Sequence, residues 1–222
     1  MARVALYYAP DLSDPLWQAG CSWLGRDPET AAASPQPALP GIADVTADAR
    51  LYGFHATLKP PMRLATGWAP FIADAEALAG RLAPFALPRL RVAELSGFLA
   101  VREAEPCPAL RVLADACVEA VDRHRLPPDE AELARRRGAG LSPAQEAMLV
   151  RWGYPGVFDA WRFHMTLTRH MTDAERSAWL RAAEAHLAPA LAQGRRVEQL
   201  CVFTQAAPGQ PFLVARRLPL RG

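Results

Sequence analysis

Short runs of β-branched and aromatic residues alternate along the chain with segments in which apolar residues recur every three or four positions. The runs predict strands over 4–8, 51–58, 157–168, 197–204 and 212–218, and a hairpin over 90–101. The hairpin turn is expected at Ser96-Gly97. The consecutive prolines Pro60 and Pro61 have no N–H to donate to a sheet, so we expect them to end the second strand.

Helical spacing of apolar residues predicts helices over 70–82, 108–124, 142–152 and 172–187. The last two begin at capping boxes, Ser142-Pro-Ala-Gln145 and Thr172-Asp-Ala-Glu175. Residues 11–50 are rich in Pro, Ala, Asp and Gly, which predicts a long irregular excursion with about one helical turn over 16–24.

The order of these elements is similar in the two halves of the chain, since each half contains a motif strand, a helix and a pair of strands. A polar stretch, 127–140, separates the halves. We therefore expect an α+β fold and a single bilobal domain over 1–222. Its lobes would cover 1–126 and 141–222, and strands are free to be exchanged between them.

Composition narrows the class of protein without identifying a function. The 222 residues are 51% hydrophobic and 22% charged, with a net charge of +2, which is typical of a globular chain and gives no reason to expect duplex DNA as a partner. No apolar run approaches twenty residues and the N-terminus lacks a signal-peptide pattern, so we expect a cytoplasmic protein without a membrane span. The four cysteines are widely spaced and predict free thiols.

One five-residue pattern occurs twice. It reads Phe54-His55-Ala56-Thr57-Leu58 in the first half and Phe163-His164-Met165-Thr166-Leu167 in the second. Side chains alternate between the two faces of a strand, so each histidine shares a face with the threonine about 7 Å further along, and the apolar residues take the other face. A histidine on a strand is usually structural, but the duplication with threonine at the same offset favours a functional site.

Two imidazoles facing one another suit the cleavage of a phosphodiester. A neutral imidazole takes a proton from water, and a protonated one gives a proton to the departing alkoxide, each worth roughly a hundred- to ten-thousand-fold in rate. The hydroxyls of Thr57 and Thr166 are placed to donate to phosphate oxygens. Two histidines without a third ligand are too few for a zinc or two-metal site, so we expect no metal and no other cofactor.

The paired His-x-Thr-Leu motifs resemble those of the 2H phosphoesterase superfamily, which includes the LigT-like cyclic phosphodiesterases. Further segments, Ala-Leu-Tyr-Tyr-Ala-Pro and Arg-Trp-Gly-Tyr-Pro among them, resemble the branch associated with phosphonate-degradation operons. The resemblance implies two antiparallel sheets related by a pseudo-twofold axis, with helices on the outer faces. It also implies that His55 and His164 act as acid and base without a metal and that Thr57 and Thr166 bind phosphate.

Other candidates for contacts with substrate are Lys59, Arg135, Arg136, Tyr154 and Arg162. Lys59 and Arg162 have the strand parity of the histidines, so we expect them on the same face. The two arginines from the crossing segment are placed to reach over a cleft, although such a run is more often a solvated helix face. Tyr154 suits stacking on a base or sugar, and equally suits the edge of a core.

The sequence therefore predicts a metal-independent enzyme that opens a cyclic phosphodiester, on a small sugar or nucleotide, to a phosphomonoester. One alternative keeps the chemistry and changes the substrate to the 2′,3′-cyclic phosphate end of a short RNA. A second alternative is a module that binds a nucleotide or RNA end without turnover, although binding alone needs no matched acid and base. The pattern gives no order for the two histidines and no oligomeric state.

Overall fold

The computed structural model describes residues 2–138 and 140–222. It is an α+β structure built on an antiparallel sheet with the strand order β4-β5-β6-β2-β1-β8-β9. These strands are β1 (Arg3–Tyr8), β2 (Ala56–Met62), β4 (Leu90–Leu95), β5 (Phe98–Glu103), β6 (Met165–Thr166), β8 (Gln199–Gln205) and β9 (Phe212–Pro219). A small second sheet pairs β3 (Phe85–Ala86) with β7 (Arg196–Val197). The predicted α+β class is confirmed.

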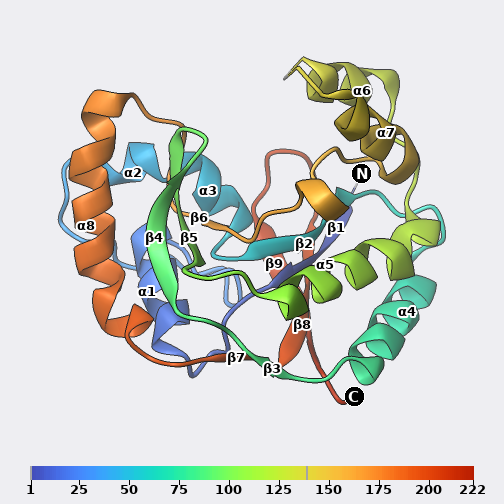
Figure 1. The fold of residues 1–222 in the computed structure, drawn as a ribbon, viewed down its shortest axis with the longest axis horizontal. Helices are drawn as coiled ribbons and strands as arrows, with labels where there is room; N and C mark the ends of the chain where they lie inside the picture. The colour runs from blue at the N-terminus through green and yellow to red at the C-terminus, as the bar shows by residue number, and fades with distance from the viewer. Residues whose placement is uncertain (1, 139) are drawn as a thin grey trace.

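The helices are arranged around this sheet (Figure 1). The long ones are α1 (Pro15–Leu24), α4 (Trp68–Arg81), α5 (Pro108–Val121), α7 (Pro143–Trp152) and α8 (Asp173–Leu191). The short ones are α2 (Ile42–Val45), α3 (Ala47–Tyr52), α6 (Glu130–Arg137) and the 3-10 turns η1 (Asp122–His124) and η2 (Phe158–Ala160). None of the helices in the described part of the chain is both long and apolar enough to cross a membrane.

The two halves of the chain meet in the middle of the large sheet. Strand β6, which holds Met165 and Thr166 of the second motif, lies between β2, which begins at Ala56 of the first motif, and β5 of the first-half hairpin. Only one residue pair, Ala56 with Met165, links β2 to β6. The strands that were expected to form two sheets are therefore hydrogen-bonded into one continuous sheet. On the far side of β6, its pairing partner is β5, which belongs to the hairpin of the first half.

The second strand begins and ends later than the sequence predicted. Leu51 and Tyr52 close α3 instead of opening a strand, and β2 continues through Pro60 and Pro61 to Met62. The prolines are tolerated because β6 is too short to pair with this end of β2, and because the pairing to β1 shifts register between Lys59 and Met62. A bulge on an edge needs no N–H from the residues within it.

The strand expected over 157–168 is mostly absent, since only Met165 and Thr166 pair in a ladder. Side-chain hydrogen bonds are found just beyond the C-terminal end of this short strand. Thr168 Oγ1 accepts a hydrogen bond from Leu99 N at 2.9 Å, and the Leu167 carbonyl accepts one from Trp23 Nε1 at 3.0 Å. These contacts satisfy backbone groups that a longer strand would have paired.

The predicted capping boxes are both formed, and they open α7 and α8. The hairpin is also confirmed, with positive φ angles of 49° at Ser96 and 93° at Gly97 in its turn. Two regions contain more helix than expected. The irregular excursion holds α1, α2 and α3, and the crossing segment holds α6.

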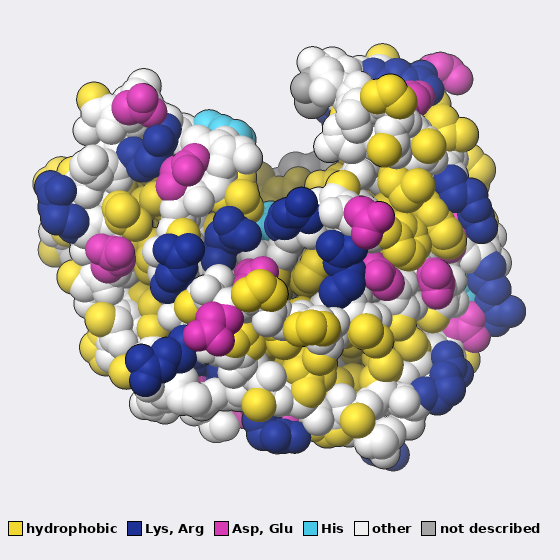
Figure 2. All heavy atoms as spheres, in the orientation of Figure 1, with side chains coloured by type: hydrophobic (Ala, Val, Ile, Leu, Met, Phe, Trp, Pro, Cys, Tyr) yellow, Lys and Arg dark blue, Asp and Glu magenta, His cyan; other side chains and the backbone are white. Residues whose placement is uncertain are grey.

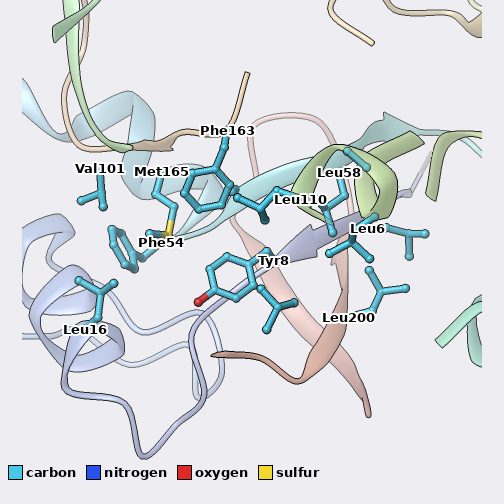
Figure 3. Packing of buried hydrophobic residues seen from close by; sticks show 14 of the residues in the cluster. Leu6, Tyr8, Leu16, Phe54, Leu58, Val101, Leu110, Phe163, Met165 and Leu200 are labelled. Atoms are coloured by element: carbon cyan, nitrogen blue, oxygen red, sulfur yellow. The ribbon is translucent and has the colours of Figure 1, made fainter. Parts of the chain in front are cut away.

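The main hydrophobic core lies on one face of the sheet. Leu6 and Tyr8 of β1 point into it, together with Phe54, Phe163 and Met165 from the two motifs (Figure 3). Helices α1, α4, α5 and α8 pack further apolar residues into this core, as do the neighbouring strands β4, β5 and β8. A smaller cluster, which includes Tyr7 and Phe203, lies against the opposite face, and it is on this second face that the motif histidines are found.

Candidate active site

The strand register brings the two motifs into one cluster. Because Ala56 pairs with Met165 in an antiparallel ladder, extending the register by one residue each way sets His55 opposite Thr166 and Thr57 opposite His164. Side chains directly opposite one another lie about 5 Å apart at Cβ and diagonal ones about 7–8 Å. The apolar residues of both motifs are fully buried on the other face, as the alternation predicted.

Both imidazoles are held by the backbone in the same way. His55 Nδ1 lies 2.9 Å from the carbonyl oxygen of Gly53, and His164 Nδ1 lies 2.8 Å from that of Arg162, two residues before each histidine. A carbonyl oxygen only accepts, so Nδ1 carries the proton in both rings. This leaves each Nε2 as the nitrogen that faces a reactant, and His55 Nε2 lies 3.2 Å from Thr57 Oγ1.

The ring of Tyr7, on β1, packs against one face of the His55 ring. The two rings stack with their centroids 3.7 Å apart and their planes 23° apart. Burial among these aromatic rings lowers the pKa of His55 from the usual 6.5 to about 4, and the nearby His164 acts in the same direction. In the free protein His55 is therefore neutral at pH 7, the state that a general base needs.

His164 is the more open of the pair and has a different neighbourhood. Its ring lies 5.8 Å from that of Phe98, the first residue of β5. Burial lowers the pKa of His164, and the positive charge of Arg102 adds to this effect. Arg102 falls opposite His164 when the pairing of Ala100 with Thr166 is extended along β5 and β6. Both histidines thus favour the neutral form when the site is empty of anions.

The cluster lies at the base of a cleft of about 410 Å³. Side chains from β1, α3, β2, α6 and β6 line it, including Tyr7, His55, Thr57 and Thr166. A neighbouring hollow of about 280 Å³ contains His164 and shares Thr57 with the cleft. Figure 2 shows the surface hollowed between the part that carries α2 and α8 and the part that carries α6 and α7.

The expectation that Lys59 shares the face of His55 and Thr57 is wrong. Lys59 is buried, and its ammonium group binds Asp122 Oδ1 at 2.8 Å and the Val118 carbonyl at 3.3 Å, at the end of α5. The reason is a second register shift between β1 and β2, which places an extra residue at Leu58. A bulge there reverses the alternation, so Leu58 and Lys59 both turn toward the core.

The other four candidates lie around the two hollows. Arg135 and Arg136 line the main cleft, and Arg136 lies 4.8 Å over the ring of Tyr154. Tyr154 borders both hollows. The side chain of Arg162 lies in the hollow of His164, where it donates to the Asp159 carbonyl at 2.7 Å.

Several residues at the site were not singled out from the sequence. Tyr7 stacks on His55, Arg3 lines the cleft, and Trp161 Nε1 donates to the Thr57 carbonyl at 2.8 Å. Arg3 and Tyr7 alternate along β1 with the residues that face the main core, so they lie on the opposite face of the strand. This alternation is the only sequence signal for them. Nothing local in the sequence marks Trp161, because its partner Thr57 lies 104 residues away in the chain.

Within residues 2–138 and 140–222, no group of three or more histidine, cysteine or acidic side chains has the arrangement of a metal site. The four cysteines are free thiols, and Cys21, Cys117 and Cys201 are buried. Burial raises the pKa of Cys201 to about 11 and that of Cys21 to about 12. These thiols therefore stay protonated at neutral pH.

Comparison with known proteins places the chain in a family. Two curated relatives, from Janthinobacterium sp. (strain Marseille) and Laribacter hongkongensis (strain HLHK9), are both named "Ribose 1,5-bisphosphate phosphokinase PhnN". They are 40% and 38% identical over 100% and 96% of this chain. The chain spans about half the length of each, 51%.

Among solved structures, E. coli LigT in apo form aligns over 99% of this chain and 98% of its own, with 15% identity and a TM-score of 0.48. LigT complexed with 3′-AMP aligns over 100% and 99%, with 16% identity and a TM-score of 0.47. The family model that matches covers residues 57–213. The chain belongs to the family described as "Protein of unknown function (DUF1045)".

Proposed function

We propose that this protein is a 2H-type phosphoesterase that opens a small cyclic phosphodiester to a phosphomonoester. The observation that carries the proposal is the pairing of Ala56 with Met165, which puts two equally oriented imidazoles and two hydroxyls on one face of the sheet. His55 and His164 act as the acid and base. Thr57 and Thr166 bind the non-bridging phosphate oxygens.

The reaction needs one neutral and one protonated imidazole, whereas burial favours two neutral rings in the empty site. A bound phosphodiester supplies a negative charge between the rings, which favours protonation of one of them. The neutral Nε2 then takes a proton from water as its oxygen attacks phosphorus. The protonated imidazole gives its proton to the departing alkoxide, the ring P–O bond breaks, and a phosphomonoester results.

The names of the curated relatives favour a sugar phosphate as the substrate. Those proteins are named for a kinase that acts on ribose 1,5-bisphosphate, and this chain aligns over its whole length with a part of one of them. A cyclic phosphate of ribose that opens to a ribose phosphate fits a cleft of about 410 Å³, and a short nucleotide fits the same chemistry. The proposal needs no metal for any proton transfer.

The test is phosphorus NMR of the protein with a panel of cyclic ribose phosphates, cyclic nucleotides and a short RNA with a 2′,3′-cyclic end, in excess EDTA. New monoester signals are expected, and His55→Gln and His164→Gln should each lose roughly a hundred- to ten-thousand-fold in rate. His170→Gln is the control, because His170 is an exposed histidine outside the two hollows.

Three results would count against the proposal. Binding without any new monoester signal would favour a binding module. Loss of activity in EDTA, restored by a divalent metal, would remove the metal-independent mechanism. Full activity in either motif variant would remove that histidine from the acid and base pair.

A further inference from the structure

The cleft is lined by more positively charged side chains than are needed to bind the one phosphate group that is cleaved. Its lining includes three arginines, Arg3, Arg135 and Arg136, and one carboxylate, that of Asp48. None of the arginines belongs to the two histidine motifs. The cleft is large enough for a small-molecule ligand that extends past the histidines and threonines.

The three consecutive arginines of α6 have different surroundings. Arg136 donates to Glu132 at 2.7 Å, and Arg137 donates to Glu146 at 2.7 Å away from the cleft lining. Arg135 is exposed on the cleft and, within the described residues, makes no hydrogen bond or ion pair through its side chain. Its guanidinium is therefore the one in this run that is free to bind a ligand.

Arg3 adds a second uncompensated cation from a separate element, β1. Its Nε donates to the amide oxygen of Gln205 at 2.8 Å, and the guanidinium lies 5.4 Å over the ring of Phe212. These contacts hold the side chain without neutralising it, since the amide and the ring carry no charge. No carboxylate in the described part of the chain forms an ion pair with Arg3.

We propose that Arg3 and Arg135 form a subsite for a second phosphate group. The preferred substrate then carries a phosphate monoester in addition to the cyclic phosphodiester that is opened at the histidines. This inference rests on the proposed function and narrows its substrate class. Guanidinium groups offer paired N–H donors that match phosphate oxygens, and Arg135 and Arg3 have such donors to spare.

The first test compares turnover of nucleoside 2′,3′-cyclic phosphates with and without a 5′-phosphate. The wild type should prefer the phosphorylated substrate by at least about tenfold in kcat/KM, which is the scale of one charge-assisted hydrogen bond. Arg135→Gln and Arg3→Gln should each reduce this preference severalfold. Arg137→Gln is the matched control from the same helix, and it should keep the wild-type preference.

The second test measures binding, so that it does not depend on turnover. Calorimetry should show that adenosine 3′,5′-bisphosphate binds the wild type at least about tenfold more tightly than adenosine 3′-monophosphate, and that Arg135→Gln removes most of the difference. Equal affinity for the two ligands, or no detectable binding of either, would overturn the subsite.

The two proposals fail in different ways. If no cyclic phosphate is hydrolysed, the proposed function is wrong, and the calorimetry still decides whether a second phosphate is recognised. If both substrates are hydrolysed at the same kcat/KM, the proposed function stands and the subsite is wrong. If Arg137→Gln loses the preference as fully as Arg135→Gln, the effect is one of general charge and the assignment to Arg135 is also wrong.

Discussion

The imidazole of His55 makes the stability of the fold depend on pH in a defined direction. Its pKa is about 4 in the folded protein, against the usual 6.5 expected in the unfolded chain, mainly because the ring is enclosed beside Tyr7. Between these two values the unfolded chain binds a proton that the folded protein does not. The free energy of unfolding should therefore fall as the pH falls below 6.5, and the effect should be complete near pH 4.

The size of the effect follows from the same two values. A shift of one pKa unit corresponds to about 1.4 kcal/mol, and by pH 5 the linkage has removed about 2 kcal/mol of stability relative to pH 7. Carboxylates with lowered pKa values, such as Glu175 at about 2, lose their contribution at more acidic pH. The interval from pH 7 to pH 5 therefore isolates the histidine contribution better than a full acid titration.

The assay is urea unfolding of the wild type and His55→Gln at pH 7, 6 and 5. The wild type should lose about 2 kcal/mol more than the variant over this interval, whatever the substitution costs at pH 7. His170→Gln, at an exposed histidine, should follow the wild type. Equal pH dependence in the wild type and His55→Gln, or an NMR titration of the His55 ring close to pH 6.5, would refute the reasoning.

Two further predictions concern packing around the motifs. Asp122→Asn should cost about 3–5 kcal/mol in urea unfolding, because it leaves the buried ammonium of Lys59 without its counter-ion. Lys59→Met should cost clearly less, since Asp122 keeps its arginine partners, and equal costs would contradict this. Gly20→Ala should cost about 1–3 kcal/mol and lower turnover, because its Cβ would lie 2.2 Å from the ring of Phe54, next to the first motif histidine. Gly80→Ala, with open space around its Cβ, is the control, and a similar loss there would refute the packing argument.

Local patterns predicted the elements that depend on neighbouring residues in the chain. The capping boxes at Ser142 and Thr172 and the turn at Ser96-Gly97 formed as expected, because side-chain caps and positive φ angles are set within a few residues. The alternation of polar and apolar residues likewise predicted that the apolar positions of both motifs would be buried.

The predictions were wrong where the bounds of a strand, or the face to which a side chain points, depended on the strand's pairing partner. Strand β6 ends at Thr166, where side chains of Thr168 and Trp23 bond the backbone groups of Leu99 and Leu167. Strand β2 passes through two prolines because that part of its edge needs no donor. Lys59 turned away from the site because of a bulge against β1. A bulge depends on the register of two strands, and no pattern within one strand reports it.

The sequence by itself determined that each histidine and the threonine two residues later would share one face with a buried face opposite, although each histidine lies one residue before its strand. The spacing within each motif was sufficient for that, since alternation is a local property of an extended chain. Only the tertiary structure decided that the two motifs lie side by side in one ladder, that Tyr7 stacks under His55, and that Arg3 and Arg135 line the same cleft. These relations join residues far apart in the chain, and they are set by how the strands pair and the helices pack.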